Sequence, residues 1–488
     1  MIATGIIILY CLFLFFVILF SIGQLALLLT YLFNKKVTVQ TDIPDQLPSL
    51  TIQLPIYNER FVIERLLDSI SKLNYPKHLM EIQVLDDSTD DTASIAENKI
   101  KELNKSGFNI KHIHRTNRSG FKAGALQNGL LNSSGEFIVI FDADFIPEEN
   151  FLHKTLVQFT TGNIGMVQTR WGFLNPTDSW LTKVQQLILD GHFIIEQEGR
   201  YKGGYFMSFN GTAGIWRKSC ILDAGGWEPD TLTEDLDLSY RAQMKGWKFT
   251  YCPEIISPSE LPDNLKAVRS QQYRWVKGGV ETSKKLLPKL WNCNLSIPVK
   301  LFGSFHLLNN YIHIFILITA ILSVPVMLIK NLQPELESLF RWNILLITIF
   351  LINFFYCFIA IRRNNKSIIS SLIEISEKFP ITTIIFLGMS YHNSKAIISG
   401  LMGKQSEFVR TPKLNSQSVE NEYLKEYPAK RLQIAELILF LYFLFAVSAG
   451  FYFNDYGFLI YHVLIFSGYG FVLRKNYTEN IQIRKKSH

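Results

Sequence analysis

Cysteine is scarce in this chain and shows no pairing pattern. Five cysteines are scattered among 488 residues, and no two of them form a Cys-x-x-Cys pair. An odd number of isolated cysteines supports neither a disulfide framework nor a zinc knuckle. The polar part of the chain is therefore expected to lie in a reducing compartment.

A large excess of charge of one sign is also missing. The chain has 49 Lys and Arg against 42 Asp and Glu, a net charge of +7. Its basic residues gather beside apolar stretches rather than along one polar face, so no nucleic acid is expected as a partner. With 48% hydrophobic residues, the chain is too apolar for a disordered protein.

Charged residues are absent from residues 1–34, where an apolar run exceeds the roughly 20 residues that cross a bilayer. A cleaved signal peptide would start with basic residues and contain an apolar core of about 7–15 residues. Here Lys35 and Lys36 follow a much longer core. The sequence therefore predicts a retained transmembrane helix over residues 1–34, followed by a linker over residues 35–48.

Four further uncharged stretches have the length and composition of membrane helices, in two pairs within residues 304–361 and 433–474. The basic residues at their ends follow the positive-inside rule if the N-terminus is outside and five helices cross. The sequence therefore predicts a multi-pass protein of the lipid bilayer. Its polar middle part and its basic tail, residues 475–488, would face the cytoplasm.

Two segments near the membrane are not predicted to cross it. Residues 286–303 are predicted to lie in the membrane interface. Residues 362–432 are predicted to form cytoplasmic or interfacial helices, because a sixth crossing within residues 380–401 would violate the charge rule.

Between the first two membrane segments, residues 49–285 alternate between short β-rich runs and helical patterns such as residues 59–73. The β-rich runs are residues 50–54, 82–85, 137–141, 166–169 and 248–251. Such alternation predicts an α/β domain with a mainly parallel sheet, which binds its ligands where the strands end.

Carboxylates follow two of these runs directly. Residues 86–90, with the sequence DDSTD, follow the second run, and taken alone they are typical of a plain turn. Asp142 and Asp144 follow the third run, and two carboxylates one residue apart can share a hard cation such as Mg²⁺ or Mn²⁺. Two such clusters at successive strand ends are much rarer by chance than one, which favours a binding site.

Two motifs nearer the membrane complete the pattern. Thr233-Glu234-Asp235 suits a helix N-terminus with Thr233 as its cap, and Asp235 there could remove the proton of a sugar hydroxyl. In the string QQYRW at residues 271–275, helical spacing places Gln271, Arg274 and Trp275 on one face. Arginine can clamp a diphosphate and an indole can carry a sugar ring. The alternative is an amphipathic helix on the membrane surface.

In this order, and flanked by membrane helices, the motifs resemble glycosyltransferase family 2 in its membrane-integrated, cellulose-synthase-like branch. The strings VLDDSTDDT, FKAGAL, FNGTAGIWR and KGWKF are most similar to the plant-type synthases of mannan, glucomannan and xyloglucan backbones. The resemblance covers residues 50–285 and, through the membrane arrangement, nearly the whole chain. It implies a cytoplasmic domain with the GT-A fold, which is Rossmann-like with a mainly parallel sheet.

The resemblance also implies roles for individual residues on the donor side. Asp235 matches the catalytic base, and Asp142 and Asp144 match the pair that binds Mg²⁺ or Mn²⁺. The other residues implied in nucleotide-sugar binding are Pro55, Tyr57, Glu59, Asp87, Lys122, Gln271 and Arg274.

On the acceptor side the resemblance implies Trp275 and a loop made of Phe209, Asn210, Gly211 and Thr212. The Asn-Gly-Thr string is also a glycosylation sequon, which a cytoplasmic site would make irrelevant. Residues 404–413 resemble a gating loop that closes over bound nucleotide, with Phe408, Thr411 and Lys413 at matching positions. Arg410 departs from the family pattern, and a basic cytoplasmic loop is the alternative.

The activity that the resemblance implies is that of an inverting, processive hexosyltransferase. It would polymerise a β-linked glucan or mannan from UDP-glucose or GDP-mannose onto a growing glycan, and the expected linkage is β-1,4. Two alternatives stay open: a single transfer to a lipid acceptor, as in ceramide glucosyltransferases, and a non-enzymatic transporter or scaffold. The uncharged membrane stretches argue against an ion-coupled carrier. The sequence decides neither the donor nor any accessory export subunit.

Overall fold

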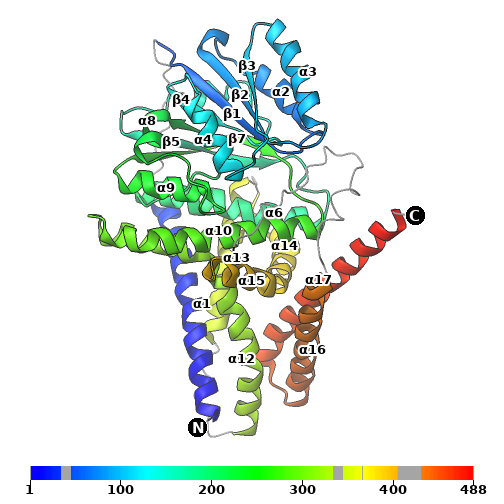
Figure 1. The fold of residues 1–488 in the computed structure, drawn as a ribbon. Helices are drawn as coiled ribbons and strands as arrows, with labels where there is room; N and C mark the ends of the chain where they lie inside the picture. The colour runs from blue at the N-terminus through cyan, green and yellow to red at the C-terminus, as the bar shows by residue number, and fades with distance from the viewer. Residues whose placement is uncertain (1, 35–45, 334–343, 365–366, 405–429, 487–488) are drawn as a thin grey trace.

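The computed structural model describes residues 2–34, 46–333, 344–364, 367–404 and 430–486. Figure 1 divides them into an α/β part and a set of long helices that extend away from it. The end of α1 (Ile2–Phe33) that carries the N-terminus lies far from the α/β part.

The α/β part is built on a seven-stranded sheet with the strand order β3-β2-β1-β4-β6-β5-β7. β6 is antiparallel to its neighbours β4 and β5, and the other paired strands are parallel. The predicted α/β fold with a mainly parallel sheet is confirmed. The strands are β1 (Leu50–Ile56), β2 (Met80–Asp86), β3 (Asn109–His114), β4 (Phe137–Ile140), β5 (Ile164–Phe173), β6 (Gly214–Arg217) and β7 (Lys248–Ser259).

Two strands, β3 and β6, were outside the sequence prediction for physical reasons. β3 has the sequence NIKHIH and lies at the edge of the sheet, where only Ile110 is buried. It therefore lacks the apolar run that marks a central strand. β6 has only four residues, GIWR, and unlike the equally short β4 it is not a continuous apolar run.

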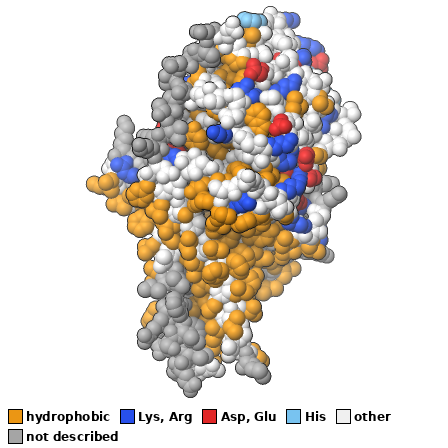
Figure 2. Space-filling model, turned by 90° about the vertical axis from the view of Figure 1, so that its left-hand side faces the viewer, with side chains coloured by type: hydrophobic (Ala, Val, Ile, Leu, Met, Phe, Trp, Pro, Cys, Tyr) orange, Lys and Arg blue, Asp and Glu red, His pale blue; other side chains and the backbone are white. Residues whose placement is uncertain are grey.

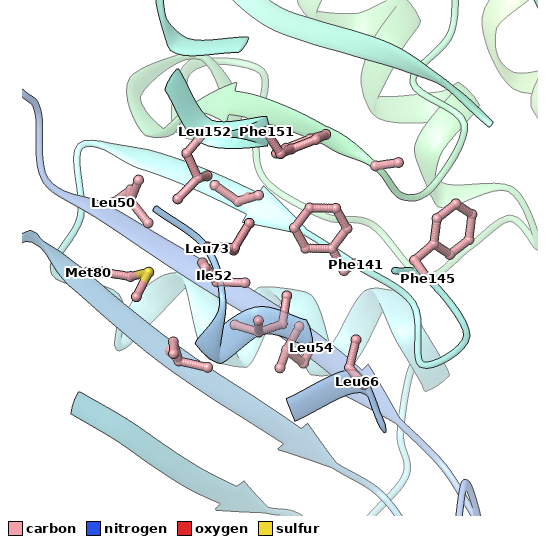
Figure 3. Close-up of a cluster of buried hydrophobic side chains, with 14 of the residues drawn as sticks. Leu50, Ile52, Leu54, Leu66, Leu73, Met80, Phe141, Phe145, Phe151 and Leu152 are labelled. Carbon is pink, nitrogen blue, oxygen red and sulfur yellow. The ribbon is translucent and has the colours of Figure 1, made fainter. Parts of the chain in front are cut away.

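A buried apolar cluster holds β1 and β2 against α2 (Ile63–Ser71) and α3 (Thr92–Lys105). Its members include Leu50, Ile52 and Leu54 of β1, Leu66 of α2, and Phe141, which follows β4 (Figure 3). A second apolar cluster, with α4 (Phe121–Leu131), covers the other face. Because β1 and β4 are packed on both faces, their carboxyl ends hold the polar residues that follow in fixed positions.

The remaining helices of the α/β part are short. They are α5 (Phe151–Leu156), α6 (Trp180–Asp190), the π-helix η2 (Gly191–Gln197), α7 (Glu198–Gly203), α8 (Lys218–Asp223) and α9 (Glu234–Met244), besides the single turn η1 (Lys77–Leu79). The longer α10 (Leu265–Asn292) lies between the sheet and the long helices (Figure 1).

Five helical stretches of the described residues are long and apolar enough to cross a membrane: Ile2–Phe33, Ile297–Leu332, Ile347–Asn364, Ile434–Tyr452 and Tyr456–Ile481. Figure 2 shows apolar side chains gathered over this part and charged side chains over the α/β part. The helices concerned are α1, α11 (Ile297–Leu308) with η3 (Asn309–Tyr311) and α12 (Ile312–Leu332), α13 (Ile344–Asn364), α16 (Lys430–Tyr452) and α17 (Tyr456–Lys486).

The second stretch begins seven residues before the predicted residue 304 (304 − 297 = 7), because the apolar pattern already starts in α11. α14 (Ile368–Gly388) and α15 (Ser390–Leu401) span the segment predicted to lie in the interface. α14 packs against α17, and α15 packs against α10 and α12.

Candidate active site

The predicted site residues converge on one cavity of about 190 Å³ at the carboxyl edge of the sheet. Parallel strands end at the same edge, so polar residues far apart in the chain meet there. Asp144 and Asp235, which the sequence places 91 positions apart (235 − 144 = 91), both line it. The predicted residues around the cavity are Pro55, Tyr57, Glu59, Asp87, Lys122, Asp142, Asp144, Asn210, Gly211, Asp235, Gln271, Arg274 and Trp275.

Two predicted acceptor residues, Phe209 and Thr212, do not line the cavity because their side chains are fully buried. The Phe209 ring packs edge-on against Trp216, with 5.6 Å between ring centroids. The Thr212 hydroxyl accepts a hydrogen bond of 2.9 Å from the Asp142 backbone N–H. Both side chains therefore support the loop from the protein interior. The predicted gating residues Phe408, Thr411 and Lys413 lie outside the described residues.

The end of the cavity nearest β1 and β2 is preorganised by contacts between loops. The Arg118 guanidinium lies 3.4 Å from the centroid of the Tyr57 ring, and it also lines the cavity. Both carboxylate oxygens of Asp87 accept hydrogen bonds from Arg115, at 2.7 and 2.5 Å. Neither arginine was predicted, because each partner is distant in sequence and no local pattern marks it.

Three charged groups meet where β4 ends. The Lys122 ammonium donates to Asp142 Oδ1 at 2.5 Å and to the Gly211 carbonyl at 3.0 Å. Asp144 Oδ2 accepts a 3.1 Å hydrogen bond from the Glu260 backbone N–H. Lys122 was predicted beside the nucleotide phosphates; here it lies against Asp142, at the edge of the same cavity.

Asp235 lies in the first turn of α9 and faces a tight glycine turn. Its Oδ1 accepts a 2.8 Å hydrogen bond from the Leu236 N–H. Gly211 opposite has a φ of +80°, and a Cβ there would lie 3.1 Å from Asp235 Oδ2. Thr233 occupies the predicted cap position, but its hydroxyl makes no capping bond and instead contacts the Thr282 hydroxyl of α10 at 3.0 Å.

The surroundings of the acidic pair at the start of α9 raise the pKa values of both carboxyl groups. Burial, together with the neighbouring charge of Glu234, raises the pKa of Asp235 to about 7. Burial also raises the pKa of Glu234, against the opposing charge of Lys122. A carboxylate with a pKa near neutrality can accept and release a proton in a reaction cycle.

Gln271, Arg274 and Trp275 reach the cavity from α10. The start of this helix is capped by Asn264, whose Oδ1 accepts from the Ala267 N–H at 2.9 Å. The alternative, an amphipathic helix on the membrane surface, would expose basic residues of this segment, but Lys266, Arg269 and Lys277 are buried. Arg269 is paired with Glu436 of α16, so α10 is a packed internal helix rather than a surface helix.

Asn210 is held by a polar network that no sequence pattern indicated. Asn210 Nδ2 lies 2.9 Å from His192 Nε2, and His192 Nδ1 lies 3.0 Å from Glu196 Oε2. Gln197 donates to Asn210 Oδ1 at 2.5 Å. All three partners belong to the π-helix η2, and such local widening of a helix occurs frequently at functional sites.

Similarity to known proteins shows which family this chain belongs to. The family model described as "Glycosyltransferase like family 2" matches residues 48–278. A probable glucomannan 4-beta-mannosyltransferase 2 of Oryza sativa subsp. japonica is 34% identical over 452 residues, 88% of this chain and 75% of the relative. The chain belongs to glycosyltransferase family 2. Glucomannan 4-beta-mannosyltransferase 7 of Arabidopsis thaliana is 33% identical to this glycosyltransferase over 87% of the chain and 77% of its own length.

A solved structure is similar in fold. The mannosyltransferase PcManGT from Pyrobaculum calidifontis, in complex with GDP-Man and Mn²⁺, has a TM-score of 0.51 and 19% sequence identity. The alignment covers 80% of this chain and all of that one. The predicted cellulose-synthase-like, GT-A glycosyltransferase is therefore confirmed. This family 2 enzyme is a hexosyltransferase with membrane helices.

Proposed function

We propose that the enzyme is an inverting, processive synthase that polymerises a β-1,4-linked mannan or glucomannan from a nucleoside-diphosphate hexose. The support is the similarity, over most of the chain, to proteins named glucomannan 4-beta-mannosyltransferases. GDP-mannose is the donor that this similarity favours, and UDP-glucose is the second candidate. Because the similarity extends through the membrane helices, the lengthening glycan would leave the site along them.

Asp235 is the proposed catalytic base. Its carboxylate would take the proton of the acceptor hydroxyl while that oxygen attacks the anomeric carbon of the donor. The bond from this carbon to the diphosphate breaks on the opposite side, so an α-linked donor gives a β-glycosidic bond. The raised pKa of Asp235 supports this role, because the group can then bind the proton that the reaction releases.

The proposed leaving-group side is formed by Asp142, Asp144, Gln271 and Arg274. The two aspartates fit Mg²⁺ or Mn²⁺, because carboxylate oxygens are the ligands that these hard ions prefer. When bound, such an ion supplies positive charge to the departing diphosphate. The Arg274 guanidinium, which lines the same cavity from α10, would neutralise the same charge.

The acceptor would lie between Trp275 and Asn210. An indole gives a sugar ring an apolar platform, and Asn210 can donate or accept hydrogen bonds to its hydroxyls. We propose that the site faces the cytoplasm, because Arg362 and Arg363 flank a membrane helix at the end where Arg363 pairs with Glu254 of β7. The nucleotide sugar would then be drawn from the cytoplasm.

One observation carries this proposal: Asp142, Asp144, Asp235, Arg274 and Trp275 line a single cavity although they come from three separate segments of the chain. The test is to incubate the purified full chain in detergent with labelled GDP-mannose or UDP-glucose and Mn²⁺. A water-insoluble or high-mass product that β-1,4-mannanase degrades, and that Asp235→Asn does not make, is the expected result.

Two other results would contradict the proposal in different ways. A chloroform-soluble monoglycosyl lipid would replace polymer synthesis by a single transfer to a lipid. Equal and negligible transfer by the wild type and Asp235→Asn, with every nucleotide sugar of a donor panel, would favour a non-enzymatic protein.

A further inference from the structure

A second group of potential metal ligands lies outside the active-site cavity, at the edge of the sheet. It consists of Asp86 at the end of β2 and His112 and His114 on β3. His112 Nε2 lies 2.9 Å from Asp86 Oδ2, and His114 Nδ1 lies 3.3 Å from the same oxygen. All three ligand atoms lie within 4.8 Å of one another.

The strand register explains why these side chains meet. β2 and β3 are parallel, with Asp86 opposite His114 and Val84 opposite His112. Residues two apart in a strand point to the same face, so the His-x-His spacing presents both imidazoles beside the carboxylate. The cluster follows from the sheet itself and needs no loop to arrange it.

Asp86 is held as an oriented carboxylate. Its side chain is 0% exposed, and its Oδ1 accepts a 2.8 Å hydrogen bond from the Ser88 N–H, so Oδ2 is the oxygen that faces the histidines.

The spacing of the ligand atoms suits a small transition-metal ion. Zinc binds imidazole nitrogen and carboxylate oxygen at about 2.0–2.2 Å, so neighbouring ligand atoms of a tetrahedral site lie roughly 3.3 Å apart. The distances of 2.9 and 3.3 Å lie close to this value. Two nitrogens and one oxygen favour an ion of the zinc class over Mg²⁺ or Ca²⁺. His114 is 40% exposed, which leaves an entry path and room for water as a further ligand.

A comparison within the chain separates this cluster from ordinary charge networks. Glu228, Asp230 and Asp237 also gather closely, but the Lys285 ammonium lies 2.6 to 2.9 Å from all three carboxylates. That position is already filled by a cation of the protein. Beside Asp86, the Arg115 guanidinium is instead paired with Asp87.

We propose that Asp86, His112 and His114 bind one divalent transition-metal ion of the zinc class, at a site separate from the aspartate pair of the active site. The ion would tie the carboxyl end of β2 to the edge strand β3. The residues that follow, Asp87 and Arg115, form the ion pair beside the cavity. The proposal is independent of the donor and product suggested above, because the site shares no residue with them.

The test is to titrate the chelator-treated full chain in detergent with Zn²⁺ and follow the heat of binding. The variants His112→Gln and His114→Gln keep a side chain that can hydrogen-bond Asp86 and are expected to fold. Each should weaken Zn²⁺ binding at least tenfold, because even the loss of a group that only hydrogen-bonds to a metal ligand weakens binding by about tenfold or more. His78→Gln, which changes another exposed histidine of the same part of the chain, is the matched control and should bind as the wild type does.

Two further measurements keep the outcome decisive. Zn²⁺ should raise the melting temperature of the wild type and of Asp144→Ala, but not that of His112→Gln, since an ion that binds only the folded chain stabilises it. Equal Zn²⁺ affinity in the wild type, His112→Gln and His114→Gln would overturn the proposal. Loss of binding in Asp144→Ala alone would also overturn it, because the ion would then belong to the active site. Absence of binding in the wild type would leave Asp86 as a hydrogen-bond acceptor only.

Discussion

Replacement of Asp235 by asparagine is expected to stabilise the protein while it strongly reduces sugar transfer. In the folded chain, burial and the charge of Glu234 raise the pKa of Asp235 from its ordinary value of 3.8 to about 7. One pKa unit corresponds to about 1.4 kcal/mol. Ionised Asp235 therefore costs the folded state roughly 4 kcal/mol at pH values above 7, relative to the unfolded chain. Asparagine has nearly the same shape and no charge, so it avoids this cost.

The sign of the pH dependence follows from the raised pKa. The folded state binds the Asp235 proton more tightly than the unfolded chain does. The protonated carboxyl therefore makes its full contribution to the stability of the fold below about pH 3.8, and this contribution is lost as the pH rises through about 7. The cost is roughly 2 kcal/mol at about pH 5.5 and roughly 4 kcal/mol at about pH 8.5. The stability advantage of Asp235→Asn over the wild type should thus grow by roughly 2 kcal/mol across this range.

The assay is thermal unfolding of both proteins in the same detergent, free of metal and nucleotide, from about pH 5.5 to 8.5. Asp237→Asn is the control from the same helix. Asp237 is buried and pairs with Arg241 at 2.6 Å and with Lys285 at 2.9 Å. Its loss would remove a buried carboxylate from beside two cations and should destabilise the fold by about 3 kcal/mol.

Opposite changes in stability are expected for two neighbouring aspartates, so a single experiment can refute the electrostatic account. A melting temperature of Asp235→Asn that is equal to or below that of the wild type at high pH, with no widening of the difference, would refute the electrostatic account. Transfer activity of Asp235→Asn should fall by about 10²- to 10⁴-fold, and full activity would refute its role as base.

The other predictions concern the metal pair, the acceptor and a close packing contact. Asp144→Ala should abolish metal-dependent turnover, whereas Asp178→Ala, at an exposed position, should not; full activity of Asp144→Ala in chelator-treated membranes would contradict the metal role. Trp275→Ala should impair acceptor use more than nucleotide binding, which nucleotide titration against transfer rate can measure; equal effects on both would argue against a sugar platform. Gly191→Ala should destabilise the fold by roughly 1–3 kcal/mol, because its Cβ would lie 2.5 Å from the Tyr356 ring, and Gly162→Ala, which meets open space, gives the reference melting temperature.

The sequence was most informative where an apolar run is followed directly by acids. β4 and the Asp142-Ala143-Asp144 string combine two local signals, hydrophobic run and carboxylate spacing, so both the strand and its polar end were predictable. Asp235 was predictable for a similar reason, since acids favour helix starts. Edge strand β3 gave no such signal because its sequence, NIKHIH, is largely polar.

What could not be predicted are the contacts made through space. Nothing near Arg118 shows that it stacks on Tyr57, and nothing near Thr233 shows that its hydroxyl turns to Thr282 rather than to its own helix. The network from Asn210 to Glu196 depends on the wider turn of a π-helix, which has no clear pattern in a single sequence. These arrangements are set by packing between elements, which local patterns do not encode.

The position of α10 limits how this enzyme can be cut for study. The helix presents Gln271, Arg274 and Trp275 to the cavity, and on its other side the buried Arg269 is paired with Glu436 of α16, while the Leu265 N–H donates to Glu479 of α17 at 2.7 Å. Truncation after residue 285 would leave a buried guanidinium and the first turn of the helix without the groups that satisfy them. A water-soluble fragment made in this way is expected to lose the diphosphate and sugar contacts first, although every strand of the sheet would still be present.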